Sequence, residues 1–190
     1  MQVAGGAERV TLLVTQRFPV FQPVVSRVYA DAAPLVGASG VEVHALADNK
    51  TRWLGRIPEA VWCFWSRGQF VRAASVVVYS GFYAPLAVRH QNQGRKVYYC
   101  HTIPRFAYDL YDVEKARFPW YLRGLYALGM ACFRRLYARA IGRMDVLLVN
   151  SANVQHRLQR YLGLNAQVLY PPVATQRFRW LADRSEEHTS

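Results

Sequence analysis

A chain of 190 residues that is 52% hydrophobic and 14% aromatic has the material for one folded domain, which excludes an intrinsically disordered protein. Its formal net charge of +12 favours anionic partners: nucleic acid, lipid headgroups or phosphorylated small molecules. Cys63, Cys100 and Cys132 are widely separated without CxxC spacing, which argues against a disulfide framework or zinc site and favours the cytoplasm. No apolar run approaches the length of a membrane span.

The first elements allow two interpretations. In the first, Gly5 and Gly6 open a helix over about residues 7–17, and their amides can approach a phosphate. Such a glycine pair normally follows a strand, of which residues 1–4 would be the end. In the second, Val10–Thr15 is the first strand, Val24–Val36 is the first helix and the glycines are only a leader. We favour the glycine loop.

The next segment is less regular. Val41–Leu46 alternates apolar and polar residues and follows a glycine, so it is expected to be a strand. Asn49–Pro58 is polar and ends in proline, which favours irregular structure. Trp53, Trp62 and Trp65 lie around this segment without regular basic neighbours, so packing is a better interpretation than a base-stacking platform.

The second half alternates strands and helices more clearly. Ser75–Tyr79 is a continuous apolar strand, and Tyr83–Asn92 is expected to be a helix that ends at Gly94. Lys96–Cys100 is a second buried strand, which leads directly into His101. A histidine at the carboxyl end of such a strand faces the crevice where α/β proteins bind ligands, although it can also simply bond a nearby carbonyl.

A long helical region covers about residues 119–143. Leu122, Leu125, Tyr126, Gly129, Phe133 and Leu136 recur in it at helical spacing. Arg134, Arg135 and Arg139 lie toward its end. Two interpretations apply: a core stripe with a solvated basic edge, or a membrane-surface helix, because aromatic and arginine residues together suit the headgroup region.

The last elements follow the same alternation. Met144–Val149 is expected to be a buried strand, and Ser151 is a suitable N-cap for a helix that ends at Gly163. Gln167–Tyr170 is a short strand stopped by two prolines. Strands that alternate with helices form parallel crossovers. We therefore expect an α/β fold with a Rossmann-like open parallel sheet and helices on both faces.

With these pieces in order, the chain resembles the N-terminal domain of retaining glycosyltransferases of family 4, which have the two-domain GT-B fold. The motifs that carry the resemblance are GGAERV at 5–10, VVVYSGFYAPLAV at 76–88, YYCHTIPRFAYDLY at 98–111, VNSANVQHRLQRYLG at 149–163 and QVLYPPVATQRF at 167–178. The branch it resembles most is often assigned to bacterial polysaccharide and lipopolysaccharide assembly or to mannosyl transfer. The resemblance implies a hexosyltransferase that moves a sugar from a nucleotide-diphosphate sugar to a glycan or lipid-linked acceptor.

The resemblance also implies roles on the donor side. Gly5 and Gly6 match the glycine loop that lies near the donor diphosphate, a role that backbone amides can fill. His101 matches the histidine that faces the reacting sugar and is the candidate catalytic residue.

Four further residues match positions around the acceptor crevice. Arg105 is a candidate phosphate or acceptor contact, with Asp109 as its orienting partner or as a ligand of an acceptor hydroxyl. Asn150 and Ser151 match the asparagine-serine pair that follows a late strand of this domain, and helix capping is the alternative role for them.

The resemblance divides the chain into three parts. Residues 1–173 match the N-terminal, acceptor-side domain, and residues 174–183 match the start of the connection to a C-terminal domain. Residues 184–190 read RSEEHTS, which a common sequencing-library adapter encodes, so we interpret them as an artefact. The C-terminal domain of the family supplies most donor contacts. This polypeptide alone is therefore expected to be inactive, although its parent is expected to be an enzyme.

The expected partners follow from these assignments. They are a nucleotide-diphosphate sugar, a glycan or lipid-linked acceptor and, as a further candidate, an anionic membrane surface at the inner face of the plasma membrane. No cofactor and no metal are expected. A basic nucleic-acid-binding module or another Rossmann-like nucleotide-sugar-binding domain are the alternatives, but no basic stripe with stacking aromatics is present to favour nucleic acid.

Overall fold

The computed structural model describes residues 5–47 and 55–172 of the chain, and within them it forms two parallel sheets. The larger sheet has the order β3-β4-β5-β6 and the smaller pairs β1 with β2. The strands are β1 (Val24–Val25), β2 (His44–Ala45), β3 (Val76–Ser80), β4 (Arg95–Cys100), β5 (Val146–Val149) and β6 (Gln167–Val168). This confirms the expected α/β class with a Rossmann-like open parallel sheet and flanking helices.

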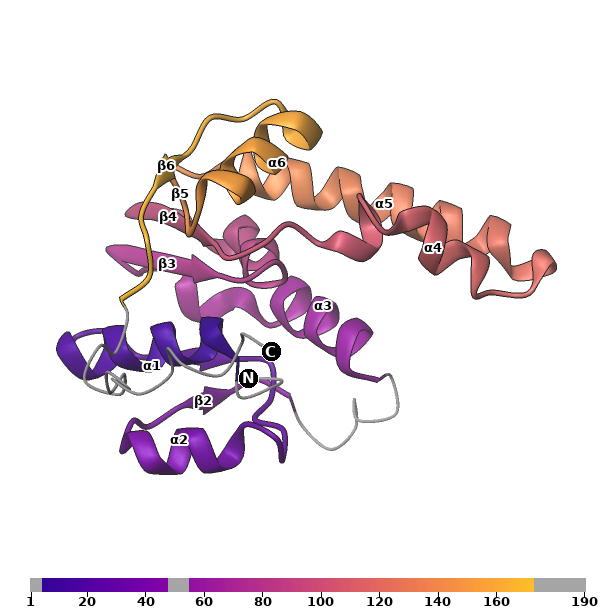
Figure 1. Ribbon diagram of the computed structural model, residues 1–190. Coiled ribbons are helices and arrows are strands. Elements are labelled where there is room, and N and C mark those ends of the chain that lie inside the picture. The colour runs from indigo at the N-terminus through magenta and orange to yellow at the C-terminus, as the bar shows by residue number, and fades with distance from the viewer. Residues whose placement is uncertain (1–4, 48–54, 173–190) are drawn as a thin grey trace, which may run out of the picture.

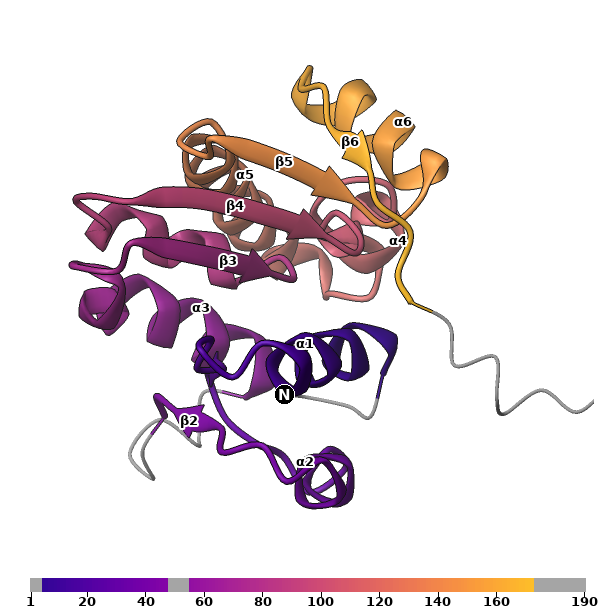
Figure 2. The same cartoon turned by 90° about the vertical axis from the view of Figure 1, so that its left-hand side faces the viewer.

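Helices connect the strands and cover the larger sheet. Figure 2 shows α3 and α5 behind the four strands, with α1, β2 and α2 beyond the β3 edge. The α-helices are α1 (Gly6–Arg17), α2 (Ala33–Ser39), α3 (Arg56–Ser66), α4 (Tyr111–Ala116), α5 (Arg123–Ile141) and α6 (Ala152–Leu162). Shorter 3-10 helices are η2 (Gly68–Val71), η3 (Ala84–His90), η4 (Arg105–Ala107) and η5 (Trp120–Leu122).

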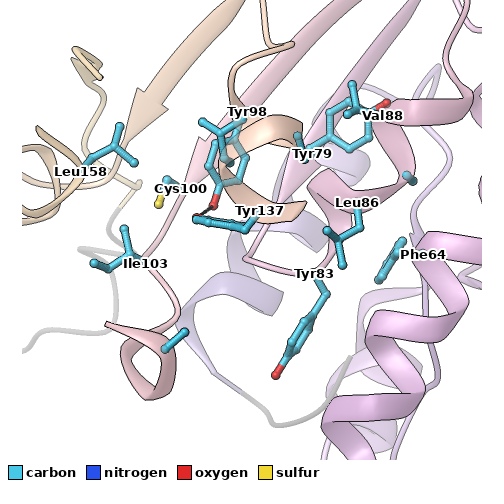
Figure 3. Packing of buried hydrophobic residues seen from close by; sticks show 14 of the residues in the cluster. Phe64, Tyr79, Tyr83, Leu86, Val88, Tyr98, Cys100, Ile103, Tyr137 and Leu158 are labelled. Carbon is cyan, nitrogen blue, oxygen red and sulfur yellow. Dashed lines mark hydrogen bonds between the residues drawn. The ribbon is translucent and has the colours of Figure 1, made fainter. Parts of the chain in front are cut away.

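The main core lies between the larger sheet and the helices behind it. Successive strand residues point to opposite faces, so Tyr98 and Cys100 share the face that packs on α5 (Figure 3). The hydroxyl groups of Tyr98 and Tyr137 lie 2.9 Å apart in this core, and Tyr79 donates to the side-chain oxygen of Gln91 at 2.8 Å. The buried phenols are thus paired, as burial in an apolar environment requires.

The N-terminal unit, residues 5–47, has a much smaller core. Its buried hydrophobic residues are Leu12 and Ala32, around which partly buried valines and a leucine pack. The helix α1 begins at Gly6, as expected in the interpretation in which the glycines open a helix, and the alternative with a strand at Val10–Thr15 is wrong. In α1 the hydroxyl groups of Thr11 and Thr15 donate to carbonyl oxygens one turn earlier, so these β-branched residues are accommodated in the helix.

Two expected boundaries in the middle of the chain are wrong. The strand expected at Val41–Leu46 is limited to His44–Ala45, which pairs with the two-residue strand β1, its one partner among the described residues. Residues 56–58, expected to be irregular, form the first turn of α3, where a proline is tolerated because first-turn amides have no helical partner. Residues 49–54 and Trp53 lie outside the described residues. Trp65 packs under the guanidinium of Arg89, 3.9 Å from its ring centre.

The helix expected at Tyr83–Asn92 is instead the 3-10 helix η3, which is shorter at both ends. Its buried side chains include Leu86 and Val88, which enter the main core. The helix expected to end at Gly94 already ends at His90, and Gly94 instead forms the turn into β4. Its φ is +75°, and a Cβ there would lie 2.2 Å from the carbonyl oxygen of Ala74, so only glycine fits this turn into β4.

The long helix expected at 119–143 begins with η5 and continues as α5. The expected core stripe is wrong in the first half of this region, because Leu122, Leu125 and Gly129 are exposed. The buried side chains of α5 are Phe133, Tyr137, Ala140 and Ile141, all in its second half. The expected α6 is confirmed, with Ser151 as N-cap and Gly163 at its end with a φ of +68°.

Candidate functional site

A cavity of about 720 Å³ lies between the two sheets. One wall is α1 with the residues before and within β1, and the other is β3 with the strand-end residues of β4. In open α/β folds, ligands bind outside the carboxyl ends of parallel strands where neighbouring crossovers diverge. The break between β1 and β3 is the corresponding position here, and we take this cavity as the candidate ligand site.

Three side chains from three elements meet in the cavity wall. The Nε2 atom of His101, directly after β4, lies 3.0 Å from the Oγ atom of Ser80 at the end of β3. The Oγ1 atom of Thr11 on α1 lies 3.5 Å from the same Ser80 oxygen. Parallel pairing of β3 and β4 brings their carboxyl ends to one edge, so the histidine meets a serine rather than a backbone carbonyl.

His101 is partly buried, and this burial lowers its pKa because the charged imidazolium loses hydration. The nearby Glu8 carboxylate raises the pKa in part but does not reverse the direction. The edge of the ring packs on Tyr99, with ring centres 4.7 Å apart. His101 is therefore neutral near pH 7, which leaves its ring nitrogens one donor and one acceptor for a ligand and for Ser80.

The first turn of α1 adjoins the same space. Ala7 and Glu8 line the cavity, whereas Gly5 and Gly6 precede them and do not line it themselves. The Glu8 carboxylate folds back over the helix start: a Cβ on Gly5 would lie 2.9 Å from its Oε2 atom. A carboxylate in the first turn interacts favourably with the helix dipole, so an incoming phosphate would compete with Glu8 for this position.

The cavity lining is mainly apolar, and among the described residues it contains no lysine or arginine. Its polar side chains include Glu8, Thr11, Ser80, His101 and Thr102. The net charge of +12 is therefore located elsewhere on the chain. A bound diphosphate would depend on helix amides for stabilisation within this wall, and any cation would have to come from outside it.

Arg105 and Asp109 pair with each other, but not in the cavity. Arg105 Nε donates to Asp109 Oδ2 at 3.2 Å, and Arg157 on α6 donates to the same oxygen at 2.5 Å. Burial alone would raise the pKa of Asp109, but hydrogen bonds from Arg157 and then Arg105 hold it below its usual range. Arg157 also reaches Thr102, which lines the cavity, so the network borders the site.

Asn150 and Ser151 likewise lie outside the cavity lining. The amide of Val154 donates to Ser151 Oγ at 3.4 Å, and the Ser151 hydroxyl donates to Asn150 Oδ1 at 3.2 Å. The backbone amide of Asn150 donates to the carbonyl of Cys100 at 3.3 Å. In this structure the pair caps α6 and fixes the end of β5, which is the alternative role expected for it.

Sequence reasoning did not single out Glu8, Thr11, Ser80 or Arg157 as site residues. Ser80 had a recognisable signal, because a serine before a glycine at a strand end is placed like His101 at the end of the next strand. Thr11 had no comparable signal, since only the packing of α1 beside β3 brings it to Ser80, 69 positions later in the chain.

Within residues 5–47 and 55–172, no three His, Cys, Asp or Glu side chains gather closely enough to hold a metal ion. In the same part of the chain, no helix combines the length and apolar character needed to cross a bilayer. No protein-family model, no curated protein and no solved structure matches this chain.

Proposed function

We propose that this chain is the acceptor-side domain of a retaining glycosyltransferase that uses a nucleotide-diphosphate sugar. The proposal rests on the motif resemblance to family 4 together with one feature of the site. That feature is the meeting of His101, Ser80 and the first turn of α1 around one cavity. A glycine-led helix start and a strand-end histidine facing one space suit a sugar diphosphate, which needs amide donors at one end and hydroxyl partners at the other.

The reaction requires one bond to break and one to form on the same face of the sugar. The bond between the anomeric carbon and the diphosphate oxygen breaks, and the acceptor hydroxyl oxygen bonds to that carbon. The acceptor proton passes to the departing diphosphate, so the nucleoside diphosphate leaves with the electron pair. Amides at the start of α1 would stabilise the growing phosphate charge, and neutral His101 would hold a sugar or acceptor hydroxyl in place.

The residues that line the cavity support the proposal that a second domain completes the site. Because no lysine or arginine of residues 5–47 and 55–172 lines it, we expect the diphosphate to receive cationic contacts from the C-terminal domain of the family, on the other side of the cleft. Domain closure would then bring donor and acceptor together in a dry site. We place the enzyme in the cytoplasm at the inner face of the plasma membrane, where a lipid-linked acceptor for cell-surface polysaccharide would be available.

The test is sugar transfer by a protein that carries this chain joined to the proposed C-terminal domain. Nucleotide-diphosphate hexoses would be incubated with glycan and lipid-linked acceptors, and nucleoside diphosphate release and product stereochemistry would be measured. We expect transfer with retention, and a loss of about 100-fold in kcat for His101→Ala, a typical magnitude for one positioned side chain. His156→Ala, at an exposed histidine of α6 outside the cavity lining, is the matched control and should keep kcat within about threefold.

Two outcomes would contradict the proposal. Tight sugar-nucleotide binding without turnover would favour a binding domain instead of a transferase. Full activity in His101→Ala would separate the cavity from the chemistry even if transfer occurs.

A further inference from the structure

The hairpin made by α4, η5 and the first half of α5 displays large apolar side chains to solvent. Trp120 is 80% exposed, Tyr121 65%, Leu125 68% and Leu128 63%. Figure 1 shows α4 and α5 running beside each other away from the sheet, with their turn at the far end. Contiguous exposed apolar side chains of this size mark interaction sites rather than ordinary surface.

The two leucines belong to one stripe of exposed side chains that changes from apolar to cationic along α5. Leu125, Leu128, Cys132, Arg135 and Arg139 are all exposed and follow each other at spacings of three or four residues. At 3.6 residues per turn they fall within an arc of about 80°. The stripe is thus apolar in the first half of α5 and cationic in the second, and we call these five residues the α5 stripe.

A different side of α5 is the one that packs on the protein. Phe133, Tyr137 and Ala140 are buried in the main core, about a third of a turn around the helix from the α5 stripe. Other residues of α5 therefore attach the helix to the protein. Leu125 and Leu128 do not belong to the main core.

The hairpin is held in place by its own contacts, so it presents the stripe as a formed surface. Tyr126 stacks between Tyr111 and Phe118, with ring centres 5.8 Å and 4.8 Å away, and its hydroxyl donates to the Phe106 carbonyl at 3.0 Å. Arg123 closes the turn by donating from Nε to the Phe118 carbonyl at 3.0 Å. A partner that binds here gains apolar contact without having to order a flexible loop.

The change of character along the stripe indicates which partner fits. The leucines of the stripe lie beside Trp120 and Tyr121 at the start of α5, and Arg135 and Arg139 follow further along the helix axis. A helix that meets the membrane at a tilt would place the leucines in the acyl boundary, about 5–10 Å deep in interfacial helices, and the arginines at the phosphates. Tryptophan and tyrosine are enriched at that same depth.

We infer that the α4–α5 hairpin docks on an anionic lipid membrane through the α5 stripe, with Trp120 and Tyr121 at the boundary between headgroups and acyl chains. This deepens the proposed function, because it places the chain where a lipid-linked acceptor lies. It depends on different residues from those of the cavity, so the two proposals can fail separately.

The experiment is co-sedimentation of the 190-residue chain with phosphatidylcholine vesicles, with and without 30 mol% phosphatidylglycerol. We expect binding to the anionic vesicles that weakens with salt, and at least tenfold weaker binding to the neutral ones. The triple variant Trp120→Ser, Leu125→Glu, Leu128→Glu should lower the partition constant at least tenfold. A single Leu13→Glu, at an exposed leucine of α1, is the control and should change it less than twofold.

Two double variants separate the effect of arginines in the stripe from the effect of net charge on vesicle binding. Arg135→Glu with Arg139→Glu should weaken anionic-vesicle binding at least tenfold, whereas Arg72→Glu with Arg160→Glu makes the same charge change at exposed positions elsewhere and should have at most a threefold effect. Equal losses in the two pairs would overturn the inference, because only net charge would then matter. Circular dichroism spectra unchanged from the parent would confirm that each variant is folded.

Cys132 provides a readout at the stripe itself, because Cys63 and Cys100 are buried. A polarity-sensitive dye on Cys132 should shift to shorter emission wavelength on addition of anionic vesicles. No shift despite sedimentation would place the membrane contact elsewhere and overturn the inference. Self-association that disappears in the triple variant, without vesicle binding in the parent, would make a second copy of the chain the partner. Nucleotide-sugar binding measured without vesicles should be the same in parent and triple variant.

Discussion

The two walls of the candidate cavity are built differently. The β3–β4 wall belongs to a sheet backed by a continuous core that includes Tyr98, Tyr137 and Leu158. The α1–β1 wall belongs to a unit whose buried hydrophobic residues are Leu12 and Ala32, and whose sheet has two residues per strand. Since local stability follows buried apolar contact, the first wall should be rigid, and the second should open at much lower free energy.

One buried ion pair joins these two regions. Arg27 of the N-terminal unit donates to Glu59 of α3 from Nε and Nη2, at 2.9 Å and 2.7 Å, and Tyr29 donates to the same carboxylate at 2.6 Å. Glu59 is 1% exposed. If a ligand enters the cavity, we therefore expect the α1 side to move more easily than the β3–β4 side that carries His101.

The largest effect on stability is expected from removing the Arg27–Glu59 ion pair. Glu59→Ala leaves the Arg27 guanidinium without its bidentate partner, so the free energy of unfolding should fall by about 3–5 kcal/mol. Urea denaturation followed by fluorescence would measure it. Glu114→Ala, which removes an exposed pair with Arg117, is the matched control at less than about 0.5 kcal/mol. Similar losses of unfolding free energy in the two variants would show that the Arg27–Glu59 pair stabilises the fold no more than an exposed pair does.

The next largest effect compares the two cores with one chemical change. Leu158→Ala should destabilise the whole chain by about 2–5 kcal/mol, because it empties space in the main core. Leu12→Ala should mainly speed amide hydrogen exchange in residues 5–47 and leave β3, β4 and β5 protected. Equal global destabilisation by both changes would mean that the two regions fold as one unit.

A smaller effect on stability is expected when pH changes the protonation of His101 in the β3–β4 wall. Because burial lowers the pKa of folded His101, the unfolded chain binds a proton more readily at this position. The contribution of His101 to stability is therefore present above its unfolded pKa, about 6.5, and decreases as pH falls below that value. His101→Gln should flatten the stability curve between pH 7 and 5. A curve that is equally steep in this variant would assign the acid sensitivity to other groups.

The smallest effect concerns the α1 wall. Glu8→Gln removes the carboxylate that lies over the helix start, so inorganic pyrophosphate should bind about two- to fivefold more tightly by titration calorimetry. Glu42→Gln, at a residue that does not line the cavity, makes the same charge change and should have little effect. Weaker binding in Glu8→Gln would show that the carboxylate assists the ligand rather than competing with it.

Local signals in the sequence located some features well. The strand that delivers His101, the cap at Ser151 and the glycine stop at Gly163 each depend on neighbouring residues, and the structure contains all three. The meeting of Thr11 with Ser80 depends on how α1 packs beside β3, which no local pattern encodes. Such tertiary contacts had to come from the structure.

The buried side of the long helix could also not be predicted from the sequence. Its sequence contains two stripes at helical spacing, and periodicity alone does not say which of them is buried. The stripe expected in the core contained Leu125, which is exposed, whereas Tyr137 and Ile141 were not included and are fully buried. The residues of the hairpin surface were therefore visible in the sequence, but their role depended on which side of α5 faces the sheet.

The most direct test of the cavity as a sugar-nucleotide site is an NMR titration with nucleotide-diphosphate hexoses of a protein that carries this chain joined to the proposed C-terminal domain. We expect chemical-shift changes at the amides of Ala7 and Glu8 and at Ser80 and His101, with the hairpin signals of Trp120 and Leu125 unchanged. Millimolar ligand that leaves the signals of these four residues in place, or shifts only those of the hairpin, would contradict a sugar-nucleotide site in this cavity.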